Sequence, residues 1–179
     1  MPLTDLNESP LLDVTIDGAN EIDIERKVMI VAGGGVPSQL KIMAKHSKKV
    51  IIIADFTKRS KHLTENWKKG IPIEVIPRDY ESVKAQIGTQ FAGEDTLRIT
   101  ENLNYIINWN FQQNEIYGVE DGKLDSRELT DTQELLAKVN LFNQRLKAIT
   151  GVIDTGIFAE YDLFPNKLDL TIYFGGDFN

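Results

Sequence analysis

The sequence has no cysteine, and this absence excludes disulfide bonds, thiolate metal sites and a cysteine nucleophile. Histidine is also scarce: His46 and His62 are 16 residues apart and each stands beside a lysine, so we expect neither a metal site nor a catalytic dyad from them. No apolar run approaches the roughly 18 residues that a membrane span needs. Residues 1–13 are acidic and lack the basic start of a signal peptide. We therefore expect a cytoplasmic protein that binds no metal and contacts no membrane.

Positive charge is scarce over most of the chain. The net charge is −7, which disfavours general binding to nucleic acid. Residues 41–69 are the exception, because their nine lysines and arginines stand against two acidic residues and give +7, which leaves −14 for the rest. This basic segment fits either an ordinary solvated surface or a face that binds phosphate or an acidic partner.

The first 70 residues have the pattern of an α/β fold. Apolar, β-branched runs predict strands over 11–18 and 48–55, and a third apolar run, 27–35, ends in three glycines. Residues 38–48 have helical spacing and follow Pro37, which suits the start of a helix. The continuous apolar run 48–55 is typical of a buried parallel strand. Strand, helix and strand joined by glycine-rich turns therefore indicate the α/β class.

The pattern changes after residue 70. Alternating and helical spacings there favour an antiparallel α+β unit. The expected elements are strands over 71–77, 151–161 and 168–175, two strands within 96–111 around the turn 101–104, helices over 79–91 and 132–149, and a polar loop over 112–131.

Five motifs occur in a particular order along the chain: TIDGANEID, AGGG…QLK, VIIIADFTKRSKHL…NWKKGIPIEVIP, TENLNYIINWNF and GVIDTGIF. In this order and spacing, residues 11–175 resemble the ribose-5-phosphate isomerase A family. The resemblance implies interconversion of ribose 5-phosphate and ribulose 5-phosphate, a step of the pentose phosphate pathway, without metal or organic cofactor. It also implies an α/β fold: a partial Rossmann-like parallel sheet, then a smaller α+β lid domain with an antiparallel sheet, with the last strand returning to the first domain.

The resemblance and the change of pattern together suggest domain limits. We expect a partial Rossmann-like α/β domain over 11–70, an α+β lid domain over 71–160, and a C-terminal strand within 161–179 that returns to the first domain.

Aldose–ketose isomerisation moves a proton between two carbons, and it needs a base and a donor for the developing oxyanion. The resemblance places the two aspartates of the family's D-G-A-D motif at Asp17, which is retained, and Asn20, which carries no charge. The family's lysine before the glycines is Ala32 here. The family's general base falls on Leu40, or on Gln39 if the alignment shifts by one, and neither side chain transfers protons.

Groups that hold the substrate are partly retained. The resemblance implies substrate contacts at the triple glycine Gly33, Gly34 and Gly35, at Lys58, and at Asn102 in ENLN, which corresponds to the family's D-N-x-N turn. The family also carries a G-x-G-S-T phosphate loop before its D-G-A-D strand, and these 179 residues contain no such motif. Backbone amides at a helix N-terminus in that loop would hold the phosphate.

Three functions remain open on the sequence alone. The joint substitutions at Asn20, Ala32 and Leu40 favour a relative that has lost catalysis and serves as a structural or protein-binding subunit. The retained Asp17 and glycine turn favour an active sugar-phosphate isomerase, completed by a partner chain or acting on another sugar phosphate. The basic segment 41–69 favours a module that binds a phosphosugar or nucleic acid. Because an incomplete parallel sheet exposes an edge and an apolar face, we expect a protein partner or a homo-oligomer to cover it.

Overall fold

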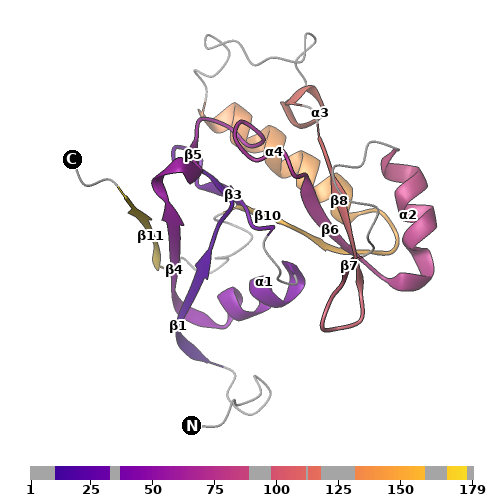
Figure 1. Ribbon diagram of the computed structural model, residues 1–179, viewed down its shortest axis with the longest axis horizontal. Helices are drawn as coiled ribbons and strands as arrows, with labels where there is room; N and C mark the ends of the chain where they lie inside the picture. Colours follow the sequence, from indigo (N-terminus) through magenta and orange to yellow (C-terminus); the bar gives the residue numbers. More distant parts are fainter. Residues whose placement is uncertain are drawn as a thin grey trace.

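The computed structural model describes residues 11–32, 37–88, 98–111, 113–117, 132–159 and 169–176, and the structural statements below concern these residues. They form three small sheets, which we call A, B and C (Figure 1). Sheet A is parallel and has the order β1-β4-β11, with β4 in the centre. Its strands are β1 (Leu12–Gly18), β4 (Ser47–Asp55) and β11 (Asp169–Gly175).

Sheet B is short and mixed, in the order β10-β3-β2-β5. Its strands are β2 (Glu21–Asp23), β3 (Val28–Ile30), β5 (Arg59–Ser60) and β10 (Ile157–Ala159). β3 forms antiparallel pairs with β2 and β10, while β2 and β5 are parallel. The apolar run 27–35 thus contributes its strand to sheet B and not to the parallel sheet.

Sheet C is antiparallel in the order β7-β8-β6-β9. Its strands are β6 (Ile71–Val75), β7 (Arg98–Ile99), β8 (Tyr105–Trp109) and β9 (Val152–Thr155). The helices are α1 (Pro37–Lys45), α2 (Tyr80–Ile87), α3 (Gln113–Tyr117) and α4 (Thr132–Lys147), with 3-10 turns η1 (Phe56–Lys58) and η2 (Pro77–Asp79). None of the described helices is long and apolar enough to cross a membrane.

Two separate clusters form the core. The larger packs sheet C against α2, α3 and α4, and its members include Ile73, Ile107 and Val139. The smaller lies between sheet A, sheet B and α1, and includes Ile52, Met29 and Ala44. The predicted fold class is confirmed, because a parallel sheet is followed by an antiparallel one and β11 returns to pair with β4.

Two element predictions are wrong. The region 112–131, predicted as a polar loop, contains helix α3, which forms because Ile116 and Tyr117 bury their side chains in the larger core. The predicted strand 151–161 is broken at Gly156 into β9 and β10. At this break the chain crosses from sheet C to sheet B, and the Gly156 N–H donates to the Pro72 carbonyl at 2.7 Å. A Cβ at position 156 would lie 2.6 Å from the Val31 carbonyl oxygen, so only glycine fits.

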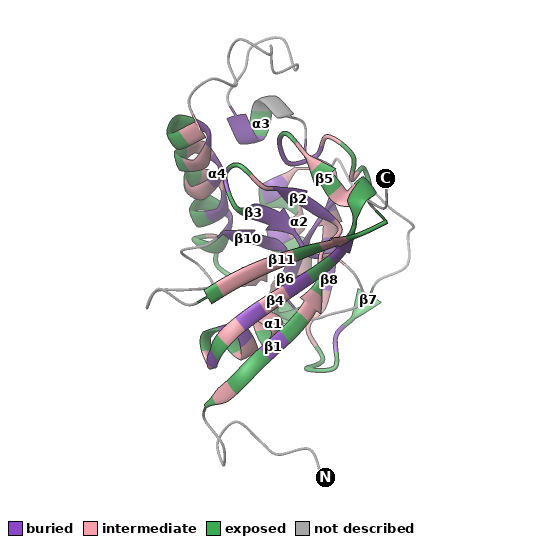
Figure 2. Cartoon of the chain, turned by 90° about the vertical axis from the view of Figure 1, so that its left-hand side faces the viewer, coloured by how far each residue is buried: buried purple, intermediate pink, exposed green. Residues whose placement is uncertain are grey.

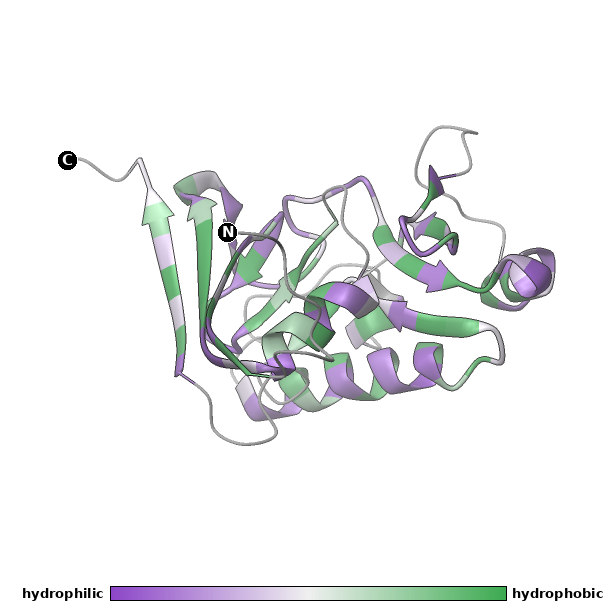
Figure 3. Ribbon diagram, turned by 90° about the horizontal axis from the view of Figure 1, so that it is seen from below, coloured by the Kyte–Doolittle hydropathy of each residue, from purple (hydrophilic) through white to green (hydrophobic). Residues whose placement is uncertain are grey.

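One face of sheet A is not covered by any other element of the described residues. Along β4, Val50, Ile52 and Ala54 point into the smaller core, while Ile53 is 53% exposed. On the strands either side, Ile16 is 63% exposed and Tyr173 is 55% exposed. In Figure 2 the sheet lies in front of the other elements, and in Figure 3 its apolar residues stand at the margin of the molecule with no helix beyond them. An apolar parallel-sheet face of this kind is ordinarily packed against other structure.

Candidate functional site

Asp17 and Lys58 lie at the same edge of sheet A, the edge formed by the carboxyl ends of its strands. Asp17 is the second-last residue of β1 and is paired with Ile52, while Lys58 ends the 3-10 turn that follows β4. Open α/β sheets bind ligands outside this edge. The structure therefore places these two predicted site residues where the fold class expects a ligand.

Asp17 is a half-buried carboxylate. Its Oδ1 accepts a hydrogen bond from the Gly18 N–H at 2.7 Å. Burial raises the pKa of Asp17, and the Gly18 N–H offsets part of that rise. No lysine or arginine of the described part of the chain forms an ion pair with it. Asp17 thus has the desolvation that a general base uses and lacks the neighbouring cation.

The fold brings Asn20 and Ala32 together, and the contact between them is a hydrogen bond that holds the backbone. The Ala32 N–H donates to Asn20 Oδ1 at 2.6 Å, and the Asn20 N–H donates to the Ile30 carbonyl at 2.8 Å. The side-chain oxygen of Asn20 thus holds the backbone two residues after the end of β3. Gly33, Gly34 and Gly35 themselves lie outside the described residues.

Leu40 packs against the smaller core from helix α1. Gln39, its neighbour, is exposed. Neither position therefore offers a group that could accept a proton from a substrate. Of the four positions at which the resemblance implies catalysis, only Asp17 carries a titratable side chain.

Glu74, a residue the sequence analysis did not single out, joins helix α1 to the hairpin of sheet C. Its carboxylate is fully buried and accepts hydrogen bonds from the Ser38 N–H at 3.1 Å and from Asn104 Nδ2 at 2.8 Å. Asn104 follows the hairpin tip that carries Asn102, which is exposed. Glu74 therefore fixes the start of α1 relative to the ENLN turn.

Lys41 ties the same helix to β9. Its buried ammonium donates to Asp154 Oδ1 at 2.6 Å and to the Thr155 carbonyl at 2.9 Å, and it lies 4.8 Å from the centre of the Phe158 ring. One member of the basic segment is thus a buried structural cation. Lys48 and Lys49 form ion pairs with Asp13 and Asp169, so the charge of the segment is partly neutralised within the chain.

Glu21 holds the loop after β5 and is not free to act on a substrate. Its buried carboxylate accepts hydrogen bonds from the backbone N–H groups of Thr64 at 2.5 Å, Asn66 at 2.6 Å and Trp67 at 3.3 Å. Thr64 adopts φ of 66°, an uncommon value for a β-branched residue, and this conformation aims the three donors at one carboxylate. Burial raises the pKa of Glu21, and the three donors act against that rise.

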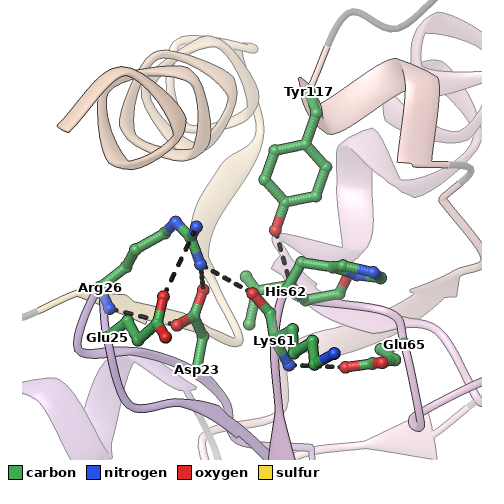
Figure 4. A network of polar contacts seen from close by, with 8 residues as sticks. Asp23, Glu25, Arg26, Lys61, His62, Glu65 and Tyr117 are labelled. Atoms are coloured by element: carbon green, nitrogen blue, oxygen red, sulfur yellow. Dashed lines mark hydrogen bonds and ion pairs between the residues drawn. The ribbon is translucent and has the colours of Figure 1, made fainter. Parts of the chain in front are cut away.

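A second buried polar group lies beside this loop (Figure 4). The Arg26 guanidinium donates to Asp23 Oδ2 and to the Lys61 carbonyl, both at 2.7 Å. Tyr117 of α3 accepts the Leu63 N–H on its hydroxyl at 2.8 Å, and burial raises the pKa of this phenol. These contacts anchor α3 and the 61–67 loop to sheet B.

A pocket beside this loop is not lined by Asp17. It has a volume of about 380 Å³ and is lined by Ile24, Glu25, Arg59, Ser60, Lys61, Glu65 and Asn66. Its two cations are balanced by two carboxylates, so it has no net charge for a phosphate. Within the described residues no group of three His, Cys, Asp or Glu side chains could hold a metal ion.

Sequence reasoning missed the two residues that fix helix α1. Glu74 had a usable signal, because it is the one charged residue in the apolar strand IPIEV. Lys41 had no such signal, because it is one of nine lysines and arginines within residues 41–69. Only the fold shows that its side chain is buried.

The sequence profile of "Ribose 5-phosphate isomerase A (phosphoriboisomerase A)" matches residues 1–164. The chain is 36% identical over 167 residues to a Homo sapiens protein named "Ribose-5-phosphate isomerase", covering 88% of this chain and 46% of that protein. It is 38% identical over 169 residues to the Dictyostelium discoideum protein of the same name, covering 89% and 63%. The chain thus spans about half to two thirds of the length of these curated relatives.

Solved structures agree with the sequence comparisons. Ribose 5-phosphate isomerase A from Methanocaldococcus jannaschii superposes with a TM-score of 0.64 at 26% identity, over 96% of this chain and 66% of that one. The structure from Neisseria gonorrhoeae gives 0.66 at 25% identity, over 96% and 65%.

Proposed function

Since this chain belongs to the ribose 5-phosphate isomerase A family, we propose that it is a member that has lost catalysis and serves as a protein-binding subunit. The proposal concerns this chain and not the longer relatives, which carry further residues that it does not match. The absence of cysteine suits a reducing compartment, and under this proposal the chain works in the cytoplasm.

One observation carries the loss of catalysis. Where the family resemblance implies a second carboxylate, a cation and a general base, the chain has Asn20, Ala32 and Leu40. The Asn20 oxygen is already bonded to the Ala32 N–H, and Leu40 packs against the smaller core. Loss of a general base alone costs on the order of 10²–10⁴ in rate. The missing cation removes stabilisation of the enediolate oxygen as well.

The uncovered face of sheet A supports the binding role. Ile16, Ile53 and Tyr173 form an apolar surface that crosses all three strands. Contiguous exposed apolar surface in a folded protein marks an interaction site. A protein that covers this face would bury side chains that are now in water.

An active isomerase is the second candidate, and Asp17 is the observation that favours it. Its carboxylate is retained and half-buried, and burial raises its pKa, as enzymes do for a carboxylate that acts as a general base. A chain with a base, supplemented by groups from a partner, would retain turnover. The basic segment supports binding of phosphate or nucleic acid less strongly than its sequence alone did. Lys41 is buried, and two further lysines form ion pairs within the chain.

The deciding experiment is an isomerase assay on the purified chain at high concentration, with ribose 5-phosphate as substrate. We expect no formation of ribulose 5-phosphate above the uncatalysed rate. A parallel preparation of Asp17→Asn identifies contaminating host isomerase, because contamination gives the same rate in both preparations. Turnover that falls in Asp17→Asn would overturn the proposal and establish the active isomerase.

A further inference from the structure

We infer that the pocket beside the 61–67 loop binds a small zwitterion, a molecule of the amino acid or short peptide class with one ammonium and one carboxylate group. The pocket has a volume of about 380 Å³, which suits a small ligand. It lies between the turn 24–27, strand β5 and the 61–67 loop. This inference goes beyond the proposed function and does not depend on whether the chain has lost catalysis.

Buried polar contacts fix the backbone that forms the pocket. Glu21 accepts the Asn66 N–H at 2.6 Å, and the Arg26 guanidinium donates to the Lys61 carbonyl at 2.7 Å (Figure 4). Asn66 Nδ2 donates to the Arg59 carbonyl at 2.8 Å, which joins the loop to β5. β5 itself pairs with β2 of sheet B. The walls are therefore held in place by the protein alone, and a ligand would not have to order them.

Arg59 connects the pocket to the β11 side of sheet A. Its guanidinium lies over the Phe174 ring of β11, 5.6 Å from the centre of the ring. A guanidinium held against an aromatic face keeps the N–H groups at its edge available for a carboxylate. The pocket thus offers an oriented donor for the negative end of a ligand.

Lys61 supplies a second cation two positions after Arg59. Both residues line the pocket and are exposed, and within the described part of the chain neither side chain forms an ion pair. A ligand carboxylate within reach of both would accept charge-assisted hydrogen bonds, which are stronger than those between neutral groups.

Two carboxylates from other segments line the same pocket. Glu65 accepts the Lys61 N–H on Oε2 at 2.6 Å, and its Oε1 accepts no hydrogen bond from the described residues. Glu25 is 74% exposed, and its ion pair with Arg26 is long, at 4.0 Å. Both carboxylates can therefore accept a hydrogen bond from an ammonium group.

The four charges do not neutralise one another inside the pocket. All four residues are described, and no ion pair joins Arg59 or Lys61 to either glutamate. A zwitterion would complement both signs at once, whereas a phosphate would also meet the two carboxylates and a simple cation would also meet the two cations. Ile24 adds an aliphatic side chain for the carbon atoms between the two ends of the ligand.

The test uses dialanine with the whole chain, beside three compounds that each lack one feature. N-acetyl-dialanine has no ammonium, dialanine amide has no carboxylate, and inorganic phosphate is an anion alone. Binding is followed at low salt through the backbone amide spectrum. We expect dialanine to shift the amides of residues 24–26 and 59–66, and each of the other three to bind about fivefold more weakly, which is the effect of one exposed ion pair.

Three variants locate the site. Glu25→Gln should weaken dialanine about fivefold and leave N-acetyl-dialanine unchanged, because only dialanine carries an ammonium. Lys61→Gln should weaken both compounds about fivefold, because both carry the carboxylate. Lys45→Gln is the matched control, since it removes the same charge from an exposed lysine of α1 that does not line the pocket, and it should change neither affinity.

Four results would overturn the inference. Equal binding of dialanine and N-acetyl-dialanine would show that the ammonium is not recognised. Stronger binding of phosphate than of dialanine would show a simple anion site. Absence of any amide shift with dialanine would show that the pocket does not take this class of ligand, and equal effects of Lys61→Gln and Lys45→Gln would show that the response follows the net charge of the chain.

Discussion

Three carboxylates near the start of the chain differ because of what surrounds them. Asp13 is solvated and paired with Lys48, which lowers its pKa. Asp17, on the same strand, is half-buried without a cation, and its pKa is raised. Glu21 is buried under three backbone N–H donors. Identical chemical groups within nine residues thus have a surface role, a candidate ligand-site role and a structural role.

Asp17→Asn should stabilise the chain at neutral pH. Folding raises the pKa of this carboxyl, so its contribution to stability is fully present below the pKa of the unfolded chain, 3.8. That contribution is lost as the pH rises through the pKa of the folded chain. The asparagine has no charge to desolvate, and its Oδ1 can still accept the Gly18 N–H. We expect a higher free energy of unfolding than the parent at pH 7, and no difference well below pH 3.8.

Asp13→Asn is the control for that measurement, and it should act in the opposite direction. Its folded pKa is lowered, so its contribution is present above 3.8 and is lost as the pH falls through the folded value. Urea unfolding of the two variants across pH 3 to 7 should give differences of opposite sign at neutral pH. The same sign for both would contradict this account of Asp17.

Glu21→Gln should destabilise the fold by about 2–3 kcal/mol, because the amide nitrogen would face a backbone N–H and leave a buried donor without an acceptor. Urea unfolding at pH 7 measures the loss. Glu25→Gln is the matched control, since its side chain is 74% exposed and should change stability by less than about 0.5 kcal/mol. Equal losses of stability in the two variants would show that the three backbone N–H donors to Glu21 contribute nothing to the stability of the fold.

At the scale of elements, helix α1 is held to sheet C at two points. Glu74 accepts the Ser38 N–H near the start of the helix, and Lys41 bonds Asp154 one turn later. Helix α1 is therefore positioned by residues that lie 36 and 113 positions away from their partners in the chain. A change in sheet C would be transmitted to helix α1 through these two contacts.

The break between β9 and β10 gives the second element-scale prediction. Gly156→Ala should destabilise the chain by about 2–3 kcal/mol, because the new methyl group would lie 2.6 Å from the Val31 carbonyl oxygen and would also meet the ring of Pro72. Thermal unfolding checks this. Gly175→Ala places the same methyl group in open space, with nothing within 4 Å, and should leave the melting temperature almost unchanged.

Elements with a long, regular pattern could be predicted from sequence. β4 and α4 have nine and sixteen residues; a continuous apolar run identifies the strand, and helical periodicity identifies the helix. β2 and β5 have three and two residues, too few for any period, and β2 buries two acids that a pattern assigns to the surface. α3 lies in a polar stretch and forms because tertiary contacts bury Tyr117.

The candidate site could be predicted only in part. Asp17 and Lys58 follow from motifs at the ends of strands, and the structure places both at one sheet edge. Their binding roles remain predictions. The contacts of Glu74 and Lys41 join residues 30 or more positions apart, so no local pattern could identify these contacts.

At the scale of the whole molecule, the apolar face of sheet A is the feature that the other described elements leave uncovered. Ile53→Lys should lower the fluorescence of a bound hydrophobic dye and leave stability nearly unchanged, because the side chain already lies in water. Leu141→Lys on α4 replaces an equally exposed leucine, 49%, away from this face. An equal fall in dye binding in both variants would show that the face is no particular patch.

The parallel arrangement of sheet A also affects how the chain reaches its fold. β4 pairs on one side with β1, about 35 residues before it in the chain. On its other side it pairs with β11, where Val50 is in register with Leu170, roughly 120 residues later. Contacts of such sequence separation form slowly, because a long loop must close first. During synthesis, therefore, the isoleucine-rich strand in the centre of the sheet leaves the ribosome well before its second neighbour exists. Until β11 is synthesised, one edge of this apolar strand is unpaired in the nascent chain. We expect chaperones to be needed most during this interval.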